Sequence, residues 1–370
     1  MNSARLLFMA LTATMVAWPA LPTMAAEADG WTLESATRRV LELAPERRAA
    51  EAEIAVREAE LRQAGSWPNP SVNLRSDDKL GQEDGRGGTD LTRAGISQPL
   101  PLTRLARQRT AAEAALRGAE EGSRSQQLQL EQETARVFYA LQLAAARFTL
   151  AQDRLALAAD TLDGNGDRAG KRATRDPLVR YLNPLERRRL AILREEAQQA
   201  VLAAQREYDK AQTGFRSLLG LPPDVAVTLA PLAPPAAPPA FAELERAFEA
   251  HPALAAARQG VESARAGIAV AESQRFADPE LGVFRERDFL NGARRDVSVV
   301  ELTVQFPLWN LNRGPVDKAK AEAMRAQANL SVLQRDAASR LLKSYTELTR
   351  LMEQVERMRA HLLEPAREVL

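Results

Sequence analysis

The chain has 370 residues, with 50 Lys and Arg against 49 Asp and Glu, a formal net charge of +1, two His and no Cys. The lack of Cys excludes disulfides and thiolate zinc sites, and two His cannot make a His-rich metal site, so we expect no metal and no cofactor. A near-neutral chain also lacks the basic surface that nucleic acids require. We find no nucleophile, base and orienting residue in one motif, so we expect no enzyme.

The first residues have the pattern of an export signal. Arg5 precedes an apolar run from Leu6 to Trp18, and small residues then offer Ala26-Glu27-Ala28 as a cleavage triplet. This pattern predicts a signal peptide over residues 1–28, with a buried N-terminal helix as the alternative. Because no later run of 18 apolar residues follows, entry into a membrane would have to use strands.

The rest of the chain contains an internal repeat. In each half, an Ala-, Glu- and Arg-rich helical segment ends at Asn69-Pro70 or Asp278-Pro279, and a β-like pair, a Pro-containing turn and a long helical segment follow. We predict a first repeat at 29–230 and a second at 241–370. The linker 231–240 has five Pro in ten residues, which favours an extended chain.

The long segments have heptad spacing, as in Leu130, Val137 and Ala144. Alternating three- and four-residue spacing is typical of coiled coils. Segment 102–162 has no Pro and predicts one helix about 90 Å long at ~1.5 Å per residue, which is longer than a compact domain. The fold class expected is therefore mainly α with a small β part.

Four strands are predicted, at Ser71–Asp77, Asp90–Gln98, Glu280–Asp288 and Asp296–Phe306. The last has the clearest alternation, and it predicts a lipid-facing strand with one apolar set of side chains: Val300, Leu302, Val304 and Phe306. The charge of Arg93 would be unfavourable on a lipid-facing surface. Because open edges are not tolerated in lipid, a barrel would need several protomers. The alternative is two ordinary surface hairpins on a periplasmic coiled-coil protein.

The sequence resembles the TolC-type outer membrane efflux proteins. Phe215 to Asp224 is like the family's LxxLLGLPPD segment. Phe306 to Gly314 is like its PLFNRNRG turn, most of all in the branch that exports cobalt, zinc and cadmium or copper and silver. Arg168-Ala169-Gly170 resembles the start of the family's periplasmic tip turn.

The resemblance implies a homotrimer. Four strands from each protomer would form one barrel in outer membrane lipid, and the long helices would form a helical barrel across the periplasm of a Gram-negative bacterium. The helix tips would meet a periplasmic adaptor coupled to an inner membrane pump of the RND type. The implied function is a passive exit duct for metal cations or other small toxic compounds, with a role in heavy-metal resistance.

Two groups of tip residues follow from the resemblance. Three acidic residues near the end of the long helix could form rings that favour cations in a trimer, or could be ordinary helix-end residues: Asp160, Asp163 and Asp167. Four residues of the next turn could contact the adaptor, or could simply form a charged exposed turn: Arg168, Gly170, Lys171 and Arg172.

The second repeat is shorter than the first, and we expect the returning helix after its long helix to be absent. Two alternatives to a working duct follow from this. One is a periplasmic coiled-coil structural or adaptor protein without a membrane barrel, and the other is a truncated, non-functional duct.

Overall fold

The computed structural model describes residues 30–77, 91–163, 183–232, 237–290 and 293–363. They form long helices and a single four-stranded antiparallel sheet, which confirms the predicted fold class. The elements are α1 (Leu33–Leu43), α2 (Pro45–Ala64), β1 (Ser71–Asp77), β2 (Leu91–Pro99), α3 (Arg104–Asp163), α4 (Pro184–Leu219), α5 (Phe241–Glu249), α6 (Pro252–Ser273), β3 (Glu280–Leu290), β4 (Ala293–Thr303), α7 (Arg313–Met358) and the π-helical turn η2 (Arg359–Leu363).

The described chain divides into two compact units, each of which draws on two stretches of sequence. The sheet unit takes its residues from 37–136 and 233–370, and the clasp unit takes its residues from 1–36 and 137–232. The predicted repeats divide the sequence differently, because the first part of α3 packs with helices of the second half. Each unit is described by itself below.

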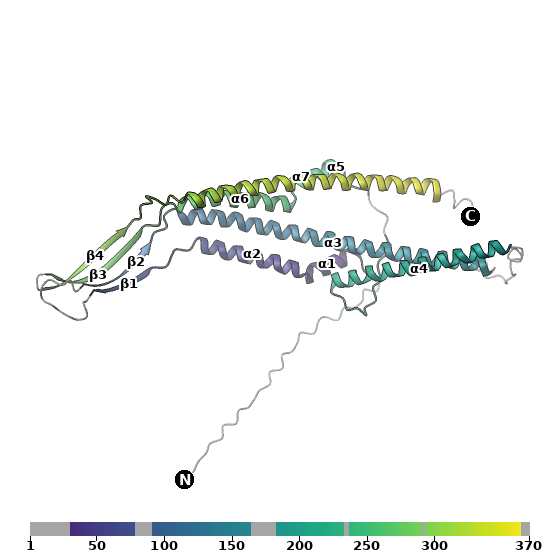
Figure 1. Cartoon of the computed structure of the whole chain (residues 1–370), viewed down its shortest axis with the longest axis horizontal. Helices are drawn as coiled ribbons and strands as arrows, with labels where there is room; N and C mark the ends of the chain where they lie inside the picture. The colour runs from purple at the N-terminus through teal and green to yellow at the C-terminus, as the bar shows by residue number, and fades with distance from the viewer. Residues whose placement is uncertain (1–29, 78–90, 164–182, 233–236, 291–292, 364–370) are drawn as a thin grey trace, which may run out of the picture. The chain divides into compact units, whose positions relative to one another are not determined.

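In the sheet unit, the first part of α3 lies beside α6, and α6 packs along α7 (Figure 1). The core between α6 and α7 contains Leu254, Val261 and Leu330. Towards α3, the Ser263 hydroxyl donates to the carbonyl of Ala111 at 3.2 Å. Burial of this apolar stripe stabilises helices whose other faces are charged and exposed.

The four strands follow one another as β1-β2-β3-β4, and each neighbouring pair is antiparallel. The first predicted strand has the observed bounds, and the next two are within two residues of theirs. The last strand differs: β4 runs from Ala293 to Thr303 and so ends before Val304 and Phe306. It ends there because β3 begins at Glu280, which is paired with Thr303.

The Phe215–Asp224 motif contains the end of α4 in the clasp unit. Phe215 and Leu219 are fully buried at the end of α4, and Gly220 has a φ of 61°, the left-handed conformation that lets the helix end. Trp31 packs edge-on against Phe215, with ring centroids 6.2 Å apart. The Trp31 amide donates to the carbonyl of Thr228 at 2.8 Å, so the segment after α4 is bound to the segment before α1.

The helices of the sheet unit are exposed over much of their length. In the described ranges, no helix is both long enough and apolar enough to cross a membrane.

Candidate functional site

The four-stranded sheet has one apolar face that is open to the surroundings. Its central row crosses all four strands, because the registers place these residues side by side: Val72, Ile96, Val283 and Val300. Their side chains are 56–72% exposed. A β-branched row of this kind, exposed on every strand, is costly in water and favourable in lipid.

The apolar face has a limit at the hairpin end of β3 and β4. There Asp296 accepts a hydrogen bond from Arg287 at 2.9 Å and lies 3.5 Å from Arg285. At the helix end, Leu281 is paired with Leu302, and the exposed apolar side chains continue beyond the strand through Val304 and Phe306. The apolar surface therefore lies between a charged hairpin end and the start of the helices.

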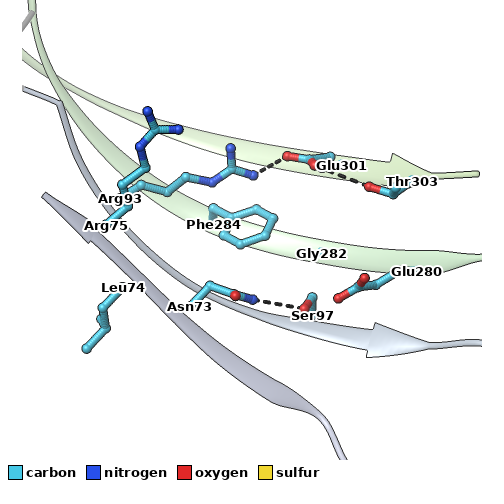
Figure 2. Close-up of a pocket in the computed structure, with 10 residues that line it drawn as sticks. All are labelled: Asn73, Leu74, Arg75, Arg93, Ser97, Glu280, Gly282, Phe284, Glu301 and Thr303. Carbon is cyan, nitrogen blue, oxygen red and sulfur yellow. Dashed lines mark hydrogen bonds and ion pairs between the residues drawn. The ribbon is translucent and has the colours of Figure 1, made fainter. Parts of the chain in front are cut away.

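The opposite face of the sheet is polar. It holds a hollow of about 330 Å³ lined mainly by Asn73, Arg75, Arg93, Ser97, Glu280, Gly282, Phe284, Glu301 and Thr303. Figure 2 shows Leu74 pointing away from Asn73, as expected for neighbours in a strand. Asn73 donates to the hydroxyl of Ser97 at 2.9 Å, and Ser97 is almost fully buried.

Phe284 lies flat on the polar face because two glycines leave room for its ring. A Cβ atom on Gly282 would lie 2.3 Å from Cε2 of Phe284, and a Cβ atom on Gly95 would lie 2.4 Å from Cδ1. The guanidinium carbon of Arg93 lies 3.6 Å from the ring centroid on the other side. The glycines, ring and guanidinium thus form a layered stack, which we call the Arg93–Phe284 stack (Figure 2).

The Arg93 charge is balanced by two carboxylates from neighbouring strands. It lies 3.2 Å from Glu286 on β3 and donates a hydrogen bond to Glu301 on β4. These partners also offset the like charge of Arg75, which is directly opposite Arg93 in the β1–β2 pair. Arg93 is therefore on the polar face, which removes the difficulty of a charged residue among apolar ones.

Polar contacts join the segments at the end of the sheet where strands and helices meet. Arg104, the first residue of α3, donates to Asp278 Oδ2 from Nη2 at 2.6 Å and from Nε at 3.1 Å. In the Phe306–Gly314 turn, Asn312 has a φ of 54° and donates to the carbonyl of Ala271 at 2.7 Å. The first contact joins α3 to the segment that leads into β3, and the second joins the start of α7 to the end of α6.

The tip predictions are outside what the structure describes. Asp167, Arg168, Gly170, Lys171 and Arg172 lie outside the described residues. Asp160 and Asp163 are at the end of α3, but their side chains are not described. The acidic ring and the adaptor contact therefore stay predictions. Among the described residues, no group of three His, Cys, Asp or Glu side chains could hold a metal ion.

Sequence reasoning missed the Arg93–Phe284 stack. The available signal was the pair of glycines inside two strands, because a strand glycine often marks a close approach by another group. The registers of the β2–β3 and β3–β4 pairs, which bring Arg93, Phe284 and Glu301 together, were not visible in the sequence.

Comparison with known proteins agrees with this geometry. Residues 36–176 match the family model described as outer membrane efflux protein. Protein CyaE of Bordetella pertussis is 28% identical over 362 residues, which cover 91% of this chain and 73% of that protein.

Several solved structures share the fold. CusC matches with a TM-score of 0.65 at 17% identity, over 90% of this chain and 79% of CusC. VceC, an outer membrane protein of Vibrio cholerae, matches with a TM-score of 0.67 at 14% identity, over 90% of this chain and 83% of VceC. MtrE, an outer membrane channel of Neisseria gonorrhoeae, matches with a TM-score of 0.62 at 18% identity, over 91% and 78%.

At these identities, the solved structures establish the fold alone. The family match relates residues 36–176 to the outer membrane efflux proteins. The fold and the two-faced sheet agree with both. Residues 36–176 thus match the family of outer membrane efflux proteins, and the described chain has the fold of CusC, VceC and MtrE.

Proposed function

We propose that three copies of this chain form a passive exit duct through the outer membrane, as part of a tripartite efflux system. The observation that carries the proposal is the sheet with an exposed apolar face, a polar face and two edge strands. Within the described sheet, β1 and β4 each have one neighbour. Unpaired edges are not tolerated in lipid, so several copies must close the sheet into a barrel.

In the closed barrel, the apolar rows face lipid and the polar hollow faces the lumen. The long helices continue the duct into the periplasm, where an adaptor and an inner membrane pump of the RND type supply the cargo and the energy. The duct itself catalyses nothing. The family match and the channel fold support this arrangement.

The proposed cargo is metal cations or other small toxic compounds, with heavy-metal resistance as the first activity to test. The support for metals is the Phe306–Gly314 turn, which resembles that of the metal-exporting branch. A conduit passes its cargo without chelating it, so the proposal needs no metal site. A strain lacking the protein should become sensitive to cobalt, zinc, cadmium, copper or silver salts. Sensitivity to organic compounds alone would indicate that the cargo is small organic compounds and not metal cations.

The test of the duct is its state in the membrane. The full chain should fractionate with the outer membrane, have the mass of a trimer in mild detergent and produce ion conductance in a planar bilayer. Recovery as a soluble periplasmic monomer would reject the duct and favour the periplasmic coiled-coil alternative.

A further inference from the structure

We propose that β4 of one protomer pairs with β1 of the next in one specific register, which places Glu301 opposite the partner's Arg75. This inference rests on the proposed trimer and adds its interface. The internal repeat specifies the register, because the β2–β3 pair joins the two hairpins inside one chain. It therefore provides a template for the contact that joins the second hairpin to the first hairpin of another copy.

The first step is to find corresponding residues in the two hairpins. Counting from Pro70 and Pro279, which precede β1 and β3, Asn73 corresponds to Gly282 and Arg75 corresponds to Phe284. The pairings within the hairpins relate the other two strands: Ser71 pairs with Ser97, and Glu280 pairs with Thr303. Ser97 thus corresponds to Thr303, and Gly95 corresponds to Glu301.

The second step is to transfer the observed register. In the β2–β3 pair, Ser97 is opposite Gly282 and Gly95 is opposite Phe284. Replacing each residue by its counterpart places Thr303 opposite the partner's Asn73, and Glu301 opposite the partner's Arg75. Leu302 then lies opposite the partner's Leu74.

The alternation of the strands agrees with this register in two ways. It places Leu302 and the partner's Leu74 on the apolar face, and Glu301 and the partner's Arg75 on the polar face. It also matches the hydrogen-bonding groups, because alternate residues of a strand turn their N–H and C=O groups to opposite neighbours. On β1 and on β4, the residues whose N–H and C=O groups point away from the sheet are either all odd-numbered or all even-numbered. The three observed registers require this parity to be the same on both strands. The inferred register pairs odd with odd and even with even.

Charge complementarity selects this register over its neighbours. A slip of one residue would turn one apolar face towards the lumen. A slip of two could put Glu301 opposite Asn73 and would lose the ion pair. In the inferred register, the carboxylate of Glu301 lies between its own Arg93 and the partner's Arg75. A carboxylate has two oxygens and can accept from both guanidinium groups.

The consequence is a closed belt of charge on the lumenal wall. Each protomer contributes Arg75, Arg93, Glu286 and Glu301, two charges of each sign. Glu301 connects the charges of one protomer to those of the next. The interface between copies is thus specified by an ion pair on one face and by an apolar pair on the other.

Cysteine cross-linking of the full-length protein in the outer membrane tests the register, because the natural chain has no Cys. Two double variants pair inferred neighbours: Asn73→Cys with Thr303→Cys, and Leu74→Cys with Leu302→Cys. Consecutive antiparallel pairs alternate between wide and narrow spacing, so one of the two is the narrow pair, which is better suited to a disulfide. The control, Ser71→Cys with Thr303→Cys, represents a slip of two residues.

We expect oxidation to give covalent dimers and trimers on non-reducing gels for at least one inferred pair, and little for the control. If the control cross-links and the inferred pairs do not, the register is wrong. A trimeric mass in detergent would then show that the proposed duct stands. A monomeric mass of the unsubstituted protein would reject the duct and the register together.

A double-mutant cycle tests the ion pair itself. Arg75→Gln and Glu301→Gln should each lower the temperature at which the trimer dissociates, and the double variant should lower it by less than the sum of the two shifts. The matched control cycle uses Arg75→Gln with Glu280→Gln, since Glu280 is on the same face but the register does not place it at Arg75. Additive shifts in the first cycle would overturn the pairing of Glu301 with the partner's Arg75.

Discussion

The two faces of the four-stranded sheet share the same backbone and differ only in alternate residues. One face presents a β-branched row with no charge along it, and the other holds two arginines, three glutamates and a ring flattened against glycines. In the proposed barrel, this difference would let strands of seven to eleven residues face lipid on one side and water on the other. Lipid requires apolar side chains, and a watery lumen allows charges that are paired.

The largest effect is expected from placing a charge on the apolar face. Val300→Arg should destabilise the inserted protein by about 2–4 kcal/mol, because the guanidinium must enter the hydrocarbon region. The measurement is the amount of protein in the outer membrane fraction and its unfolding in detergent and lipid. The control is Val297→Arg in the same strand, whose side chain is on the polar face opposite Glu286. Equal losses for both variants would contradict the assignment of the faces.

A smaller effect is expected from filling the space under Phe284. Gly282→Ala should cost roughly 1–3 kcal/mol, because the new methyl group overlaps the ring. Adding Phe284→Ala should recover most of this loss in thermal unfolding followed by circular dichroism. Gly95→Ala should not be recovered by the same change, because its Cβ atom would also lie 2.3 Å from the backbone oxygen of Val283. If Phe284→Ala restored the stability of both glycine variants, the ring alone would account for the need for glycine at these two positions.

Loss of the Arg93 charge should have a more moderate effect. Arg93→Gln leaves Glu286 and Glu301 without their shared cation, so the unfolding temperature should fall. Thermal unfolding measures the loss, and Glu286→Gln in the Arg93→Gln background should reduce it. No change in unfolding temperature on loss of Arg93 would argue against the stack as a stabilising feature.

The smallest effect is expected on the exposed surface of α3. Arg136 donates hydrogen bonds to Glu133 one helical turn away and lowers the pKa of that carboxyl. Because the folded pKa is depressed, any stabilisation is present above the unfolded pKa and is lost as the pH falls through the folded value. Both side chains are largely in solvent, so Glu133→Gln should leave thermal unfolding at neutral pH unchanged. A clear loss would show that this helix face is covered in the assembly.

Features that depend on a repeating pattern of nearby residues could be predicted from the sequence. The alternation through Val300 and Leu302 predicted an apolar face, and the Pro-free run predicted the helix that is observed at Arg104–Asp163. The sequence could not place the end of β4, since that depends on where β3 begins. It also could not bring Arg93, Phe284 and Glu301 together, because their contact depends on pairings between residues that are distant along the chain.

Site-directed labelling along β4 would show whether the apolar face is in lipid, since a single cysteine can be introduced at any position in a chain that has none. The protein is labelled in the outer membrane with a lipid-soluble and a water-soluble thiol reagent. We expect Val300→Cys and Leu302→Cys to react with the lipid-soluble reagent only, and Val297→Cys and Val299→Cys to react with the water-soluble one. Equal reaction of all four positions with the water-soluble reagent would contradict this expectation, because the apolar face would then not be in lipid.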